Sequence, residues 1–106
     1  MLETAGPQDA VWLVRQIVAD LDRMRDGLMG ALAAGNTAAL RPVSHALAGL
    51  GGTIGAAHLH AAAQRLNEAA KREDGAAVAT YGAAVVDSLV ALQAMVAQRL
   101  SALGAP

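Results

Sequence analysis

The feature that most constrains this chain is the spacing of the large apolar residues between positions 40 and 54. Leu40, Val43, Leu47, Leu50 and Ile54 follow one another at intervals of three, four, three and four residues. That spacing puts one side chain per turn on a single face of an α-helix, whereas a half-buried strand alternates every second residue. Alanine, the strongest helix former, supplies much of the remaining apolar content, and aromatic residues, which strands favour, make up 2%. The sequence therefore predicts an all-α fold.

Comparable stripes predict four helices, over about 7–34, 37–52, 56–72 and 76–103. Connections as short as those between them force consecutive helices to run antiparallel. At 106 residues, the chain is long enough for one such domain. We therefore expect residues 1–106 to form a single antiparallel, up-down four-helix bundle. The expected inward residues outside the second helix are Leu13, Ile17, Leu21, Met24, Leu28 and Leu32, then Leu59, Ala62, Ala63, Leu66 and Ala70, then Val78, Val85, Leu89, Leu92, Val96 and Leu100.

Composition excludes several functional classes. The chain has no cysteine and a net charge of −1, so it offers neither a disulfide framework nor the basic surface that nucleic acids or anionic membranes attract. The segment 42–64 carries no formal charge and is long enough to cross a bilayer. Its three histidines, its glycines and its one-sided apolar stripe favour a helix without a membrane span. His58 and His60 are two residues apart, on different helix faces, so we expect surface polar residues rather than metal ligands.

The outer face of the second predicted helix carries a single imidazole. His45 lies almost opposite Leu47, the centre of the apolar stripe, when successive residues are placed about 100° apart. Gly49 lies one turn beyond His45 on the same side, although a glycine within a helix costs about 1 kcal/mol relative to alanine. Gly49 either clears space for a close approach to the ring or begins a fraying, glycine-rich helix end. The remaining neighbours on this face are Ala38, Arg41, Ala48 and Gly52.

A polar stripe on the third predicted helix lies level with that imidazole. The stripe consists of His60, Gln64, Asn67 and Lys71. If the two helices are antiparallel, an amide near Gln64 to Asn67 is placed to bond one ring nitrogen of His45 and leave the other free as a nucleophile. Lys71 would add positive charge one turn further on. The alternative interpretation is an ordinary solvated face.

The segment Ser44-His45-Ala46-Leu47-Ala48-Gly49 resembles the H-x-L-K-G signature of histidine phosphotransfer (HPt) domains. Ile54-Gly55-Ala56, Leu59 and Leu66 fall at the positions where that family has L-G-A, L and L-E. The resemblance implies a four-helix bundle whose exposed histidine accepts a phosphoryl group from the aspartyl phosphate of a receiver domain and passes it to another. It implies His45 as the phosphoacceptor and Gly49 as the residue that gives clearance.

The resemblance also implies supporting roles. Asn67 stands where the family commonly has Gln or Glu to orient the imidazole, and Gln64 is our second choice for that role. Lys71 matches a position that is basic in some members. The family's lysine, three residues after the histidine, is Ala48 here, so Lys71 or Arg41 would have to supply its charge.

An HPt domain needs no autonomous catalytic machinery, because phosphoryl transfer depends mainly on positioning and electrostatics. We expect this domain to bind no cofactor, with Mg²⁺ supplied by the partner receiver. The expected partners are a response-regulator receiver domain and a hybrid histidine kinase. We expect the domain itself to be a monomer and to lie in the cytoplasm. Two alternatives stay open at this point: a degenerate HPt fold that binds a receiver without phosphotransfer, and a helical dimerisation or scaffold bundle.

Overall fold

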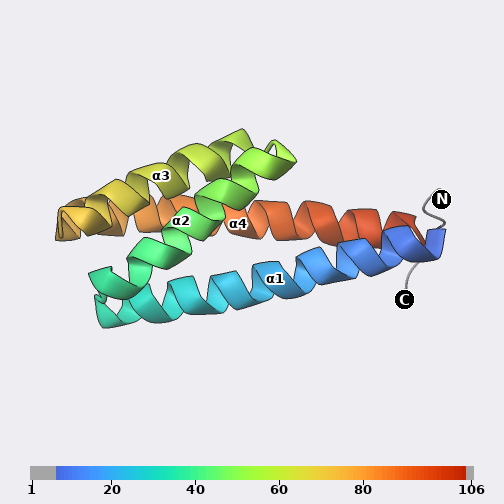
Figure 1. Cartoon of the computed structure of the whole chain (residues 1–106), viewed down its shortest axis with the longest axis horizontal. Helices are drawn as coiled ribbons and strands as arrows, with labels where there is room; N and C mark the ends of the chain where they lie inside the picture. The colour runs from blue at the N-terminus through green and yellow to red at the C-terminus, as the bar shows by residue number, and fades with distance from the viewer. Residues whose placement is uncertain (1–6, 105–106) are drawn as a thin grey trace.

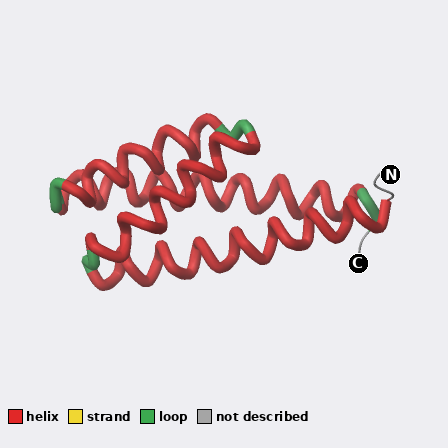
Figure 2. Tube along the Cα trace, in the orientation of Figure 1, coloured by secondary structure: helices red, strands yellow, loops and turns green. Residues whose placement is uncertain are grey.

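The computed structural model of the protein describes residues 7–104, with side chains from Asp9 onward, and consists of four helices joined by short turns (Figures 1 and 2). The helices are α1 (Pro7–Ala34), α2 (Thr37–Ile54), α3 (Ala57–Lys71) and α4 (Gly75–Ala102). The predicted all-α class is confirmed. The predicted bounds agree to within two residues, and the parts of the predicted domain at 1–6 and 105–106 lie outside the described residues.

The turns are built from residues that suit them. Gly35 has a φ of 63°, and Asn36 then caps α2 by accepting a hydrogen bond from the Ala39 N–H at 3.0 Å. α2 ends at Gly55, which has a φ of 77°. We expected this helix to end near residue 52, but the glycines that precede Gly55 stay helical and the left-handed residue alone makes the turn. Asp74 caps α4 in the same way as Asn36 caps α2.

The helices form a closed antiparallel ring. Each packs against its neighbours in the chain, and α1 also packs against α4, while the diagonal pairs of the described helices make no direct backbone contact. α1 and α4 each have 28 residues, whereas α2 has 18 and α3 has 15. The long pair therefore projects beyond the short pair at the end where α1 begins and α4 ends, and the molecule is elongated, at 48 × 27 × 19 Å (Figure 1).

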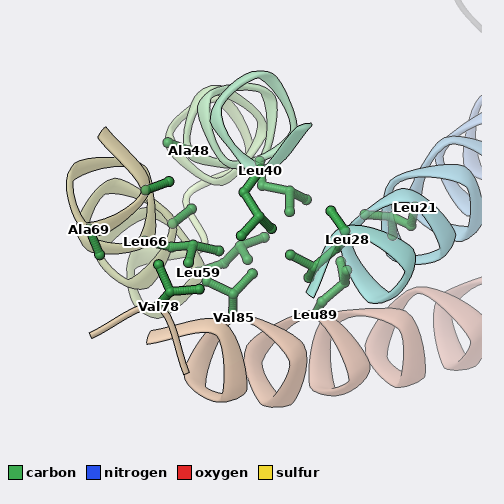
Figure 3. Close-up of a cluster of buried hydrophobic side chains, with 14 residues drawn as sticks. Leu21, Leu28, Leu40, Ala48, Leu59, Leu66, Ala69, Val78, Val85 and Leu89 are labelled. Atoms are coloured by element: carbon green, nitrogen blue, oxygen red, sulfur yellow. The ribbon is translucent and has the colours of Figure 1, made fainter. Parts of the chain in front are cut away.

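The core lies where all four helices overlap (Figure 3). Two of the predicted inward residues are exposed, Leu13 at 52% and Ile54 at 40%. Leu13 lies in the projecting part of α1, and Ile54 is the last residue of α2, so neither has helices packed around it on all sides. The fully buried large side chains are Leu21, Leu28, Leu40, Leu47, Leu59, Leu66, Val85 and Leu89.

Among the described residues, α4 is the one helix whose length and composition would let it cross a membrane. Its apolar window has a mean hydropathy of 1.6 and is 22% buried. A single helix of this kind is weak evidence, because a helix that packs in the core of a folded domain passes the same criterion. The segment 42–64, considered from the sequence, is divided between α2 and α3 by the turn at Gly55.

Candidate functional site

His45 lies on the outer face of α2, across the helix from the buried Leu47. Its imidazole is exposed and makes no hydrogen bond to any described residue. Gly49, one turn further along, is also exposed, and a Cβ built there would meet no atom within 4 Å. The space beside the ring is therefore open to solvent.

An open groove runs beside His45 between α2 and α3 and reaches α4. It brings His45 and Gly49 together with three residues of the predicted polar stripe, His60, Gln64 and Asn67. Lys71, the fourth residue of the stripe, does not line it. The remaining lining residues are Ala48, Arg65, Glu68, Arg72 and Tyr81.

Asn67 does not contact the imidazole in this structure. Its Nδ2 donates to the Arg41 carbonyl at 2.9 Å and to Ser44 Oγ at 3.1 Å. The expected bond to His45 is not formed because this short amide is held against the α2 backbone one turn before the histidine. Its Oδ1 has no hydrogen-bond partner among the described residues. Asn67 therefore fixes α3 against α2 at the base of the imidazole.

Ser44 is a residue that our reading of the sequence missed. Its hydroxyl is fully buried, donates to the Arg41 carbonyl at 3.1 Å and accepts from Asn67. The signal was present in the sequence: Ser44 is three residues before Leu47 and so falls on the buried face of the helix, where a hydroxyl requires a partner.

The other predicted site residues, Gln64, Lys71 and Arg41, differ in whether they line the groove. Gln64 is exposed, lines the groove and makes no hydrogen bond to a described residue. Lys71 and Arg41 are exposed outside the groove lining, and neither side chain forms an ion pair with a described residue. Of the two predicted amides, both line the groove, but only Gln64 has no hydrogen bond to a described residue. Neither predicted cation, Lys71 or Arg41, lines the groove.

Ala48 and His60 correct two expectations. Ala48 was placed on the outer face, but it is only 8% exposed, because α3 packs over that side of α2 (Figure 3). His60 was expected on the surface, but it is half-buried, and its Nδ1 lies 2.7 Å from the Ala48 carbonyl oxygen. His58 is exposed, as expected. The packing of α3 against α2 buries Ala48, which a projection of α2 alone places on the solvent-exposed face.

Two cations that line the groove were not identified from the sequence. The Arg65 guanidinium lies 5.9 Å from the centre of the Tyr81 ring, a cation–π arrangement. Arg72 forms an ion pair with Glu68 at 3.8 Å, and both side chains are mostly exposed. Exposed pairs of this kind contribute about 0–1 kcal/mol, so Arg72 is easily redirected to another anion. Both arginines lie beside the predicted stripe rather than on it.

The site contains no cluster of metal ligands. Within the described part of the chain, no group of three or more His, Asp or Glu side chains is arranged to hold a metal ion. The chemistry available at the groove is thus that of an exposed imidazole with guanidinium groups nearby. This combination suits a nucleophile that receives an anionic group.

Comparison with known families agrees with this geometry. The family model described as "Hpt domain" matches residues 12–102, which include all the residues discussed at the groove. No significant match is found among curated proteins or among solved structures.

Proposed function

Because this chain belongs to the Hpt domain family, whose role lies in the phosphorelays of two-component signalling, we propose that His45 accepts a phosphoryl group from a receiver aspartyl phosphate and passes it to another receiver. The observation that carries the proposal is the exposed His45 imidazole, which has no hydrogen bond to a described residue and lies beside the open space at Gly49. A nucleophile in that position can meet a donor held on another domain.

The phosphoryl transfer requires no cofactor bound to this chain. A lone pair on a ring nitrogen of His45 forms a bond to phosphorus while the acyl phosphate P–O bond of the donor breaks and the aspartate leaves as a carboxylate. The second step is the reverse reaction with a different aspartate. Receivers would bring the Mg²⁺ that neutralises charge on the transferring group. This domain contributes the nucleophile and its surroundings.

Orientation of the ring is the task we assign to the two amides. Asn67 has an unused Oδ1, and its Nδ2 is anchored to Arg41 and Ser44. In this proposal His45 Nδ1–H donates to Asn67 Oδ1 in the receiver complex, which leaves Nε2 as the nucleophile. Gln64 is the second candidate, because it lines the groove and is longer and uncommitted.

Positive charge for the transferred group would come from the groove. The family's lysine is absent, since Ala48 is buried in its place. Arg72 and Arg65 line the groove, whereas Lys71, our candidate from the sequence, is exposed one turn beyond Asn67. We assign the stronger effect to the arginines and a weaker, longer-range effect to Lys71, because charges in water are screened with distance.

The direct experiment is transfer from a receiver that carries a ³²P-labelled aspartyl phosphate. The wild-type domain should acquire label that is lost in acid and retained in alkali, while His45→Gln should acquire none over the same time course. His58→Gln is the matched control, because His58 is equally exposed on the neighbouring helix and does not line the groove. Labelling of His45→Gln at the wild-type rate would exclude His45 as the acceptor from receivers.

One observation favours a second candidate function, a module that binds a receiver without accepting its phosphoryl group. The family's lysine, three residues after the histidine, is the buried Ala48 here, and neither Arg41 nor Lys71 lines the groove. For this candidate, the receiver would bind the wild-type domain and His45→Gln equally well, and neither protein would be labelled. Both proposals include a cytoplasmic location and a monomeric state.

A further inference from the structure

The groove contains a second histidine whose ring is held in one orientation. His60 Nδ1 lies 2.7 Å from the Ala48 carbonyl oxygen, within the normal range for an N–H···O hydrogen bond. A carbonyl oxygen can only accept, so Nδ1 carries the proton. In the neutral ring, Nε2 then holds the free lone pair. His45, in contrast, has no bond that selects one tautomer.

The second ring nitrogen of His60 is accessible to solvent. No buried side-chain nitrogen or oxygen among the described residues lacks a hydrogen-bond partner, and His60 Nε2 has no partner among those residues. Nε2 is therefore accessible, although the residue as a whole is half-buried. We take the groove that His60 and His45 both line as the route by which a donor reaches this nitrogen.

Two glycines of α2 make this position of the ring possible. A Cβ at Gly52 would lie 3.2 Å from His60 Nδ1, and one at Gly51 would lie 2.8 Å from the His60 backbone nitrogen. A larger residue at Gly51 would push the α3 backbone away from α2, and one at Gly52 would displace the imidazole ring. Each glycine costs the helix about 1 kcal/mol relative to alanine. That cost is offset by the close contact that holds His60 Nδ1 on the carbonyl.

We propose that His60 is a second phosphoryl acceptor in this groove, reacting at Nε2 with small phosphoramidate or acyl phosphate donors. Of the two arginines that line the groove, Arg65 is five residues from His60 and is the one we assign to the phosphoryl oxygens, whereas Arg72 is about 18 Å away along the helix axis. The proposal does not rest on His45 being an acceptor, because each histidine has its own nitrogen and its own surroundings. It also explains the glycines at the end of α2, because Gly51 and Gly52 allow the ring position that the reaction requires.

Phosphoramidate would transfer its phosphoryl group to His60 in one displacement. The Nε2 lone pair of His60 forms a bond to phosphorus, the P–N bond of the donor breaks, and the donor nitrogen leaves as ammonia with the protons that it already carries. The ring keeps its Nδ1 proton on the Ala48 carbonyl and becomes positively charged next to the phosphoryl oxygens. Because the carbonyl hydrogen-bonds this protonated ring, which is a good leaving group, the phosphoryl group on His60 can be passed on to an acceptor.

The experiment uses the full chain with one histidine left in place. His45→Gln/His58→Gln retains only His60, and His45→Gln/His60→Gln retains only His58, because the chain has three histidines. Both proteins are incubated with phosphoramidate and followed by ³¹P NMR, which distinguishes the two phosphohistidine isomers. We expect His60 to react severalfold faster than His58 and to give the Nε2 isomer alone. The unconstrained His58 ring should give both isomers.

A purely structural role for His60 predicts a different result. If the ring only joins α3 to α2, the His60 protein stays unlabelled or reacts no faster than the His58 protein, and either outcome overturns the proposal, as does an Nδ1 isomer. His60 itself is unchanged in the reacting protein, and the two substituted residues are exposed, so the fold is maintained. Adding Gly52→Ala to that protein should displace the ring and remove the preference for one isomer. A failure of His45 to accept from a receiver would leave these results unaffected.

Discussion

Gly51→Ala and Gly49→Ala form a pair that measures the close contact between α2 and α3. Both glycines lie inside α2, half a turn apart, and alanine gains about 1 kcal/mol of helix propensity at either position. The added methyl group meets nothing within 4 Å at Gly49. At Gly51 it meets the His60 backbone nitrogen at 2.8 Å and Cα at 3.0 Å, and the Ala56 carbonyl oxygen at 3.2 Å.

The effect of Gly51→Ala on the free energy of unfolding depends on which neighbouring atoms can move to make room for the methyl group. The three atoms near Gly51 belong to the backbone, so no side-chain rotation relieves the contact and α3 has to shift. Forcing an extra methyl group into a packed contact costs about 1–3 kcal/mol. Gly49→Ala should therefore raise the free energy of unfolding by up to about 1 kcal/mol. Since the propensity gain cancels between the two variants, Gly51→Ala should be the less stable by about 1–3 kcal/mol.

Urea unfolding followed by far-ultraviolet circular dichroism tests this pair. A domain of this size should unfold in one cooperative transition, so the midpoints can be compared at equal slope. We expect the Gly49→Ala midpoint above that of the wild type and the Gly51→Ala midpoint below it. Equal midpoints for the two variants would refute the reasoning, because they would show that α3 can move away from α2 without loss of stability.

Three further predictions concern individual residues. Asn36→Ala removes the side chain that caps α2 and should lower the free energy of unfolding by about 1 kcal/mol in the same urea assay; an unchanged midpoint would show that water replaces the cap. Ser44→Ala leaves the half-buried Asn67 amide with one partner fewer and should cost about 1–2 kcal/mol, and a stabilised variant would contradict the role given to the hydroxyl. Arg72→Ala should shorten the lifetime of phosphorylated His45, measured by loss of label, more than Lys71→Ala does; the reverse order would return the electrostatic role to the lysine.

The fold could be predicted because its determinants are local. Apolar spacing located the helices, and the turn between the first two is made by adjacent residues, with Gly35 in the left-handed conformation and Asn36 as the cap. The exposure of His45 also followed from its angle to Leu47 on one helix. None of these features requires knowledge of how two helices meet.

The remaining details of the site depend on contacts between helices. Periodicity places Asn67 at the level of the histidine, but it does not show that the amide nitrogen would bond to Ser44. It also cannot show which side of α2 is covered by α3, so it left Ala48 in solvent and His60 on the surface. Both errors come from treating a helix as if its surroundings were symmetrical about the apolar stripe.

The unequal lengths of the helices imply that the domain does not open uniformly. Amide hydrogens around Leu47 and Leu66 are surrounded by all four helices, whereas those in the projecting parts of α1 and α4 are protected by one partner helix. Local opening is cheapest where the fewest buried contacts must be broken, so hydrogen exchange should proceed inward from the projecting end. His45 belongs to the slowly exchanging part. Sequence change in the projecting pair can therefore accumulate without disturbing the surroundings of the imidazole.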